Sequence, residues 1–149
     1  MKILDDKSIL AKYEKSKVAK TISFLPEQIS ESWQDVIDIK LPKKYNKPAN
    51  LMVCGMGGSN LATELVRSIY GREMKIPFVL VRNYNVPNFV SNKSLVIVSS
   101  YSGNTEEPIN CLKSALGKKA NIFVMAGGGK LISLAKKHKL PYYKINSSK

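Results

Sequence analysis

Residues 95–107 have the sequence Leu95-Val-Ile-Val-Ser-Ser-Tyr-Ser-Gly-Asn-Thr-Glu-Glu107. The first four residues are apolar and three of them are β-branched, which predicts a strand covered on both faces. The polar stretch that follows ends in two glutamates, which suit the positive amino-terminal end of a helix. A buried strand, a polar loop and a helix in this order indicate one unit of a parallel α/β sheet.

The same succession recurs along most of the chain. Four further short apolar runs have the character of buried strands: 51–54, 78–81, 121–125 and 142–145. Three helical patterns separate most of the runs: 61–70, 106–116 and 131–138. Because strands joined by helical crossovers pair in parallel, we predict an α/β fold, a three-layer αβα sandwich around a five-stranded parallel sheet. We expect the strands in flavodoxin-like order.

The first 48 residues have a different texture. Apolar residues between positions 3 and 10 have helical spacing, and the stretch 26–37 begins with Pro in its first turn, as helices often do. A polar break follows at 43–48. We predict that residues 1–48 form an N-terminal helical segment that packs on the domain, and that residues 49–149 form the domain itself.

The composition is that of a globular protein. At 149 residues, with 44% apolar and 23% charged residues, the chain can bury the core of one domain. No run approaches the roughly 18 apolar residues that a membrane span needs, and the amino terminus lacks the apolar segment of a signal peptide. Cys54 and Cys111 have no metal-site spacing, and the chain contains one His. We expect both cysteines to be small buried side chains in a reducing cytoplasm, and no metal site.

The net charge of +13 is unevenly distributed. From Lys75 onward, twelve Lys or Arg face two acids, Glu106 and Glu107. A solvated lysine-rich surface explains this excess, and so does a field that attracts small phosphorylated anions. Nucleic acid is a third candidate partner. The chain has three Arg, and most Tyr and Phe lie in apolar runs, so the sequence does not favour nucleic acid.

Three loops of similar composition follow predicted strands, where α/β sheets bind ligands: 55–59, 99–105 and 126–130. Each is rich in Gly or Ser and precedes a predicted helix, whose amino-terminal N–H groups attract anions. Ser100, Ser102 and Thr105 add hydroxyl donors to the middle loop, which predicts an anion site without a metal or a cofactor. In the alternative interpretation these residues are ordinary helix caps, and Glu106 and Glu107 complement the helix dipole.

Nucleotide-binding motifs are absent. The stretch 55–60 begins like the dinucleotide fingerprint, but Asn60 stands where the third Gly belongs. Lys130 follows a Gly as in a P-loop, but the next residue is Leu131 rather than Ser or Thr. The sequence therefore does not favour a nucleotide as the anion.

Four motifs, taken together, resemble a known family. In chain order they are Gly55-Met-Gly-Gly-Ser59, Arg82-Asn-Tyr-Asn-Val-Pro-Asn-Phe-Val90, Ser100-Tyr-Ser-Gly-Asn-Thr-Glu-Glu107 and Gly127-Gly-Gly-Lys-Leu131. They resemble the amino-terminal half of bifunctional phosphoglucose/phosphomannose isomerases, which are proteins of the sugar isomerase (SIS) superfamily. Asn83 and Pro108 depart from that pattern, where Asp and Thr are expected.

The resemblance implies that Gly58 and Ser59 shape a sugar pocket and that Ser100, Ser102 and Thr105 hold the phosphate. It implies a homodimeric, metal-free and cofactor-free aldose–ketose isomerase that interconverts glucose 6-phosphate or mannose 6-phosphate with fructose 6-phosphate. The family has two SIS domains, and this chain resembles one.

The Glu, His and Arg that serve catalysis in the family have no counterpart in this chain, so its catalytic residues stay unidentified. His138 is expected at the carboxyl end of the last helix, away from the loops. We expect a phosphosugar-binding half-enzyme, inactive without a second SIS domain. The alternative is a single-SIS sugar-phosphate sensor or regulatory module.

Overall fold

The computed structural model describes residues 9, 12–16 and 18–145. The chain divides into two compact units, Met1–Lys40 and Leu41–Lys149. The first unit contains helices α2 (Val18–Ser23) and α3 (Leu25–Ile37), and α3 confirms the helix predicted at 26–37. Of the residues with predicted helical spacing between positions 3 and 10, all except Ile9 lie outside the described residues.

The second unit is built around a five-stranded sheet. Its strands are β1 (Asn50–Cys54), β2 (Phe78–Val81), β3 (Ser94–Ser100), β4 (Asn121–Ala126) and β5 (Tyr142–Lys144). Its α-helices are α4 (Gly58–Tyr70), α5 (Glu106–Gly117) and α6 (Gly129–Lys137). All neighbouring strands are parallel, in the order β2-β1-β3-β4-β5, which confirms the predicted flavodoxin-like fold.

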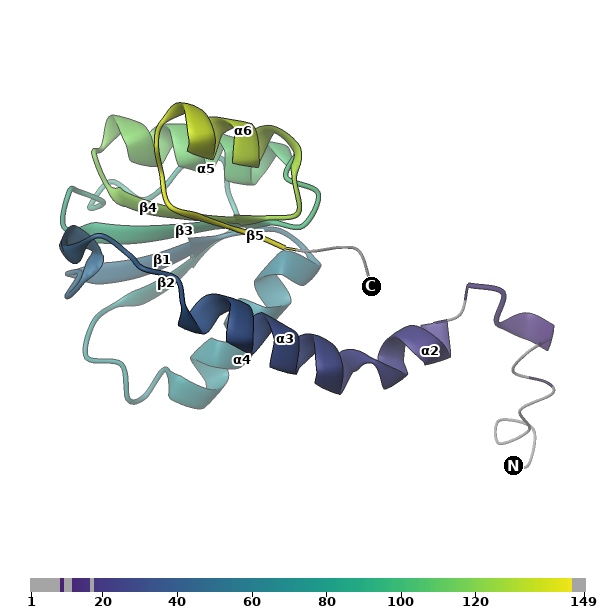
Figure 1. Ribbon diagram of the computed structural model, residues 1–149. Helices are drawn as coiled ribbons and strands as arrows, with labels where there is room; N and C mark the ends of the chain where they lie inside the picture. Colours follow the sequence, from purple (N-terminus) through teal and green to yellow (C-terminus); the bar gives the residue numbers. More distant parts are fainter. Residues whose placement is uncertain (1–8, 10–11, 17, 146–149) are drawn as a thin grey trace. The chain divides into compact units, whose positions relative to one another are not determined.

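The helices cover both faces of the sheet (Figure 1). Helices α5 and α6 lie together on one face, and α4 lies on the other, which completes the predicted three layers. The chain from Arg82 to Lys93 joins β2 to β3 without a helix, and the buried Val86 and Val90 anchor it in the core. Because all the strands are parallel, every strand ends at the same edge of the sheet, which we call the carboxyl edge.

The central strand β3 is the longest and pairs with β1 on one side and β4 on the other. Val96 and Val98 on one face of β3 have no exposed surface, whereas Leu95 and Ile97 on the other face are partly exposed. Cys54 and Cys111 are also fully buried, as predicted, and the Cys111 thiol donates to the Asn83 carbonyl at 2.9 Å. The neighbouring Cys111 thiol, together with burial, raises the pKa of the Cys54 thiol.

A short 3-10 helix, η1 (Lys43–Tyr45), belongs to the sheet unit. Its tyrosine is 4% exposed, and the Tyr45 hydroxyl donates a hydrogen bond of 2.9 Å to the Ile122 carbonyl at the start of β4. The polar stretch before β1 is therefore fixed to the sheet by one buried side chain.

Two loops at the carboxyl edge meet through their backbones. A Cβ atom on Gly103, which has φ of 68°, would lie 1.8 Å from the Gly128 carbonyl oxygen. The Gly103 carbonyl in turn accepts the Leu131 N–H at 2.9 Å, and the Tyr101 carbonyl accepts the Gly127 N–H at 2.9 Å. Glycine is therefore required at Gly103 both by the turn and by the neighbouring chain.

Within the described residues, no helix is long and apolar enough to cross a bilayer. Among the same residues, no three His, Cys, Asp or Glu side chains gather in a way that could hold a metal ion.

Tyr45→Phe tests the anchor of η1. The substitution leaves the Ile122 carbonyl without its donor and should lower the free energy of unfolding by about 1–2 kcal/mol at pH 7. Burial raises the pKa of Tyr45 from its ordinary value of 10.0. A phenol whose pKa is raised by folding contributes stability that is present below pH 10 and is lost as the pH rises through the raised pKa.

The difference between wild type and Tyr45→Phe should therefore shrink as the pH rises above 10. Urea denaturation followed by circular dichroism measures it. Tyr84→Phe, at an exposed tyrosine, is the matched control and should cost little. A difference that does not change with pH would contradict the role of burial.

Gly103→Ala tests the contact between the two loops. Because the new methyl group meets backbone rather than a mobile side chain, we expect a loss of about 2–4 kcal/mol in the free energy of unfolding. Gly117→Ala is the control, because a Cβ there meets nothing within 4 Å. It lies at the end of α5 and should stay within about 1 kcal/mol of wild type. Equal midpoints for the two variants in urea would refute the contact.

Candidate anion site

The loop between β3 and α5 brings three hydroxyl groups together. Ser100 is the last residue of β3 and is 3% exposed, Ser102 lies in the loop, and Thr105 immediately precedes α5. The Ser100 Oγ lies 2.9 Å from the Thr105 Oγ1 and 3.5 Å from the Ser102 Oγ. The structure thus clusters the three residues that the sequence predicted as phosphate ligands.

Backbone N–H groups orient two of these hydroxyls. The Gly103 N–H donates to the Ser100 Oγ at 3.2 Å, and the Asn104 N–H donates to the Ser102 Oγ at 3.2 Å. A hydroxyl has one hydrogen to give and two lone pairs to accept with. Because the Ser102 Oγ accepts the backbone bond through a lone pair, its hydrogen can be donated either to the Ser100 Oγ or to an incoming acceptor.

Thr105 does not cap the helix that it precedes. It occupies the N-cap position of α5 with extended backbone, yet its side chain makes no hydrogen bond to the first helical turn. Pro108 has no N–H, and the Ile109 N–H already donates to the Thr105 carbonyl at 3.3 Å. The backbone N–H groups of Glu106 and Glu107 therefore have no intrahelical acceptor and carry the positive end of the helix dipole.

The loop after β1 lies beside the loop that carries the three hydroxyls. Ser59, in the first turn of α4, accepts a hydrogen bond of 3.2 Å from the Tyr101 N–H. A Cβ atom on Gly57 or on Gly58 would meet nothing within 4 Å, so the space in front of this turn is open. Ser59 is thus joined to the hydroxyl cluster, while Gly58 is exposed beside it.

Two asparagines that the sequence did not single out as site residues also lie here. The Asn104 side-chain oxygen accepts the Lys130 N–H at 3.0 Å and so ties the hydroxyl loop to the start of α6. Asn60 is 2% exposed, and neither polar atom of its side chain has a hydrogen-bond partner among the described residues. The sequence does not single out Asn60 as a site residue because its burial is visible only in the folded chain.

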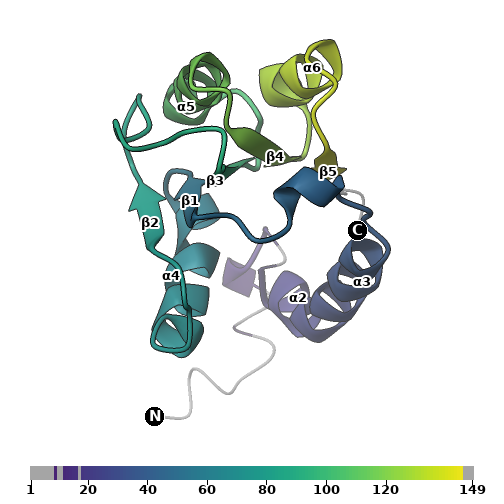
Figure 2. The ribbon, with the colours of Figure 1, turned by 90° about the vertical axis from the view of Figure 1, so that its left-hand side faces the viewer.

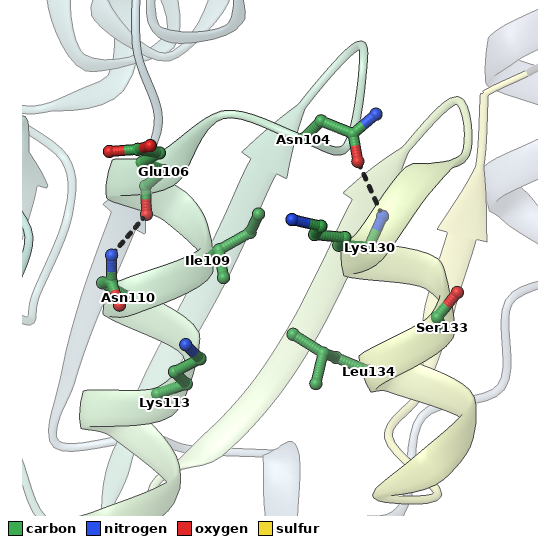
Figure 3. Close-up of a pocket in the computed structure, with 8 residues that line it drawn as sticks. All are labelled: Asn104, Glu106, Ile109, Asn110, Lys113, Lys130, Ser133 and Leu134. Atoms are coloured by element: carbon green, nitrogen blue, oxygen red, sulfur yellow. Dashed lines mark hydrogen bonds between the residues drawn. The ribbon is translucent and has the colours of Figure 1, made fainter.

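A groove of about 600 Å³ opens beside this cluster, between α5 and α6 (Figure 3). Its floor contains Ile109 and Leu134, and the Lys113 and Lys130 ammonium groups border it. Glu106 lines this groove. None of the predicted phosphate ligands does, so the groove is separate from the hydroxyl cluster.

Groups that could move a proton are not gathered at the cluster. His138 follows the last residue of α6, at the opposite end of the helix from the loops. The Arg82 guanidinium forms an ion pair with Glu64 of α4, which also contacts Arg67 at 3.1 Å. The arrangement can hold an anion, and the acids nearest to it along the described chain, Glu106 and Glu107, lie in the first turn of α5.

Comparison with known proteins gives relatives for most of the chain. No family model matches it. It is 38% identical over 113 residues to the bifunctional phosphoglucose/phosphomannose isomerase of Caldicellulosiruptor bescii, across 76% of this chain and 33% of that protein. It is 32% identical over 117 residues to the D-glucosamine-6-phosphate 4-epimerase of Sulfolobus acidocaldarius, across 77% of this chain and 36% of that protein.

The fold also occurs in solved structures. The crystal structure of a candidate phosphosugar isomerase from Clostridium difficile matches with a TM-score of 0.64 at 19% identity, over 79% of this chain and 34% of that chain. The chain spans about a third of the length of the curated relatives it matches. The resemblance seen in the sequence is confirmed: the chain is a relative of the bifunctional phosphoglucose/phosphomannose isomerases, has the SIS fold of phosphosugar isomerases and spans about a third of such an enzyme.

Proposed function

We propose that this chain is the phosphosugar-binding half of an aldose–ketose isomerase that interconverts glucose 6-phosphate or mannose 6-phosphate with fructose 6-phosphate. The observation that carries the proposal is the cluster of Ser100, Ser102 and Thr105 hydroxyls in front of an uncapped helix. The isomerase named among the relatives gives the substrate class.

The phosphate group would sit at the start of α5. Its oxygens accept hydrogen bonds from the Ser102 and Thr105 hydroxyls and from the free N–H groups of the first helical turn, where the helix dipole favours negative charge. Ser100 is buried and holds both hydroxyls in place. The open space before Gly58 and Ser59 would receive the sugar.

Isomerisation needs more than this site offers. Moving a proton between adjacent carbons requires a base in contact with that proton. Glu106 lines the groove between α5 and α6, and His138 lies at the far end of α6. We therefore expect the base and the ring-opening acid to come from a second SIS domain.

Helix α4 offers a surface for that second domain. Its one buried residue is polar, Asn60, whereas Leu61, Leu65 and Ile69 are 71%, 62% and 57% exposed. These three residues are four positions apart and form one apolar stripe, which we call the α4 stripe. Exposed apolar patches on soluble proteins commonly mark interfaces. A second SIS domain, whether from another copy of the chain or from a separate chain, is the occupant that we propose.

Ligand-induced stabilisation tests the anion site. Glucose 6-phosphate, fructose 6-phosphate or 5-phosphoarabinonate binds only the folded chain and should stabilise it by about 2.7 kcal/mol at a concentration a hundredfold above Kd. That corresponds to a rise in Tm of roughly 5–10 °C, which differential scanning fluorimetry detects.

The double substitution Ser102→Ala and Thr105→Ala should abolish this shift, because it removes the two hydroxyl donors. Ser68→Ala is the matched control, since the Ser68 Oγ donates to the Glu64 carbonyl on the exposed face of α4. Ser68→Ala should show the same ligand-induced rise in Tm as the wild type. A full shift in the double variant would reject the site.

Catalysis and pairing test the second half of the proposal. The chain alone should show only background isomerase activity in a coupled assay with fructose 6-phosphate. Leu65→Glu places a charge in the α4 stripe and should abolish association in sedimentation experiments, while the ligand-induced shift in Tm remains. Arg72→Gln, at an exposed residue outside the α4 stripe, is the control and should leave association unchanged. Turnover by the chain alone would show that it contains its own base.

The epimerase relative supports a second candidate, a part in the epimerisation of an amino sugar phosphate. The anion site would serve equally, because both substrates carry a phosphate. Glucosamine 6-phosphate raising Tm more than glucose 6-phosphate at equal concentration would favour the epimerase.

A further inference from the structure

The positive charge of this protein belongs to one of its two units. Residues 1–40 contain seven Lys and seven acids, whereas residues 41–149 contain seventeen Lys or Arg and four Glu. The whole net charge of +13 therefore lies on the sheet unit.

Within that unit, lysines gather where the strands begin. Four segments lead into β1, β3, β4 and β5, and between them they contribute eight exposed lysines. These are Lys43, Lys44, Lys47, Lys93, Lys119, Lys136, Lys137 and Lys139. We call this set the lysine rim. Because the strands are parallel, the rim lies at the edge of the sheet opposite the hydroxyl cluster, and this edge faces the viewer in Figure 2.

Hydrogen bonds hold these segments to one another. The Ala49 N–H donates to the Lys93 carbonyl at 2.9 Å, and the Asn121 side chain donates to the Asn92 carbonyl at 3.0 Å. The tyrosine of η1 joins the first segment to β4, as described above. Lysines that are distant in the sequence thus share one firmly built edge.

Few acids compensate the rim. The segments 41–49, 91–94, 117–120 and 134–141 contain no Asp or Glu, and the segment that leads into β2, at the same edge, contains one, Glu73, beside Arg72 and Lys75. None of the eight lysines forms an ion pair within the part of the chain that the structure describes. Helix dipoles account for the lysines at the carboxyl ends of α5 and α6, but not for those that precede β1 and β3.

Three of the lysines adopt a backbone conformation that non-glycine residues rarely adopt. Lys47, Lys119 and Lys139 have φ of 57°, 55° and 53°, and they are the non-glycine residues with positive φ among those described. Gly or Asn adopts this conformation more readily. All three positions belong to the rim.

We propose that the lysine rim binds the phosphate backbone of double-stranded nucleic acid. The rim contains no Arg, the residue that protein interfaces enrich while they deplete Lys. Its four segments expose no Tyr, Phe or Trp, the side chains on which the bases of single strands stack. Clustered lysines without stacking groups fit a regular array of duplex phosphates.

The size of the rim suits this partner. Neighbouring strands lie about 4.8 Å apart, so the three intervals from β1 to β5 span ~14 Å. The major groove of a duplex is about 12 Å wide, and the rim can therefore contact phosphates on both of its sides. Without Arg to contact base edges, binding should not depend on sequence.

The small number of Arg and the position of most Tyr and Phe in apolar runs weighed against nucleic acid in the sequence. Those features exclude base recognition and stacking, but they leave backbone binding open. Since the rim and the hydroxyl cluster lie at opposite edges, duplex binding and sugar-phosphate binding can succeed or fail independently.

Fluorescence anisotropy with two 20-base-pair duplexes of unrelated sequence tests the proposal on the 149-residue chain. The rim variant carries Lys93→Gln, Lys119→Gln and Lys137→Gln. The control variant carries Lys113→Gln, Lys130→Gln and Lys144→Gln, outside the rim. Each variant lowers the net charge from +13 to +10, so bulk charge is matched. Circular dichroism establishes that both are folded.

Both duplexes should bind the wild type equally, and the rim variant should bind at least tenfold more weakly. The slope of log K against log salt should fall by about 3 in the rim variant, one unit per lost phosphate contact. The control variant should stay within threefold of wild type. The glucose 6-phosphate shift in Tm should be unchanged in the rim variant.

Three results would overturn the proposal. Equal losses in the two variants would mean that bulk charge alone attracts the duplex. Tighter binding to phosphatidylserine vesicles or to poly-glutamate than to the duplex, at the same ionic strength, would assign the rim to a lipid surface or an acidic protein. No measurable binding to the duplex at 50 mM salt would leave the lysines as a solvated edge.

Discussion

The close approach of two backbones at Gly103 and Gly128 is the contact on which the carboxyl edge depends. A side chain at Gly103 would separate the loop after β3 from the loop after β4. If they separated, the Asn104 bond to α6 and the Leu131 bond to the Gly103 carbonyl would both be lost. The hydroxyl cluster is therefore held by the neighbouring loop as well as by its own turn.

The parallel sheet gives the second unit two chemically different edges. At the carboxyl edge, an anion would meet hydroxyls and helix N–H groups, which are short-range and directional donors. At the opposite edge the charge comes from lysines on flexible stems, which act through a long-range field that salt screens. One edge is suited to a small ligand in a defined pose and the other to an extended polyanion.

Much of this architecture could be predicted from the sequence, because buried parallel strands are continuous apolar runs. The run at 95–98 lies within β3, and the glycine and serine content of the following loop was enough to single out the three clustered hydroxyls. The contact between Gly103 and Gly128 could not be predicted, because it joins loops 25 residues apart through backbone atoms. Asn60 was also missed, since its burial depends on how α4 lies on the sheet.

The strand order has a consequence for synthesis on the ribosome. Strand β1 ends at Cys54 and β3 begins at Ser94, yet these two strands are neighbours at the centre of the sheet. Each residue of β1 pairs with a residue 44 positions later in the chain, as Asn50 does with Ser94, so the inner edge of a newly made β1 stays unpaired until β3 has emerged. The hairpin-like local contacts that let other chains fold early are missing, so an exposed strand edge persists during translation. Slow elongation through the segment between β2 and β3 would prolong that exposure.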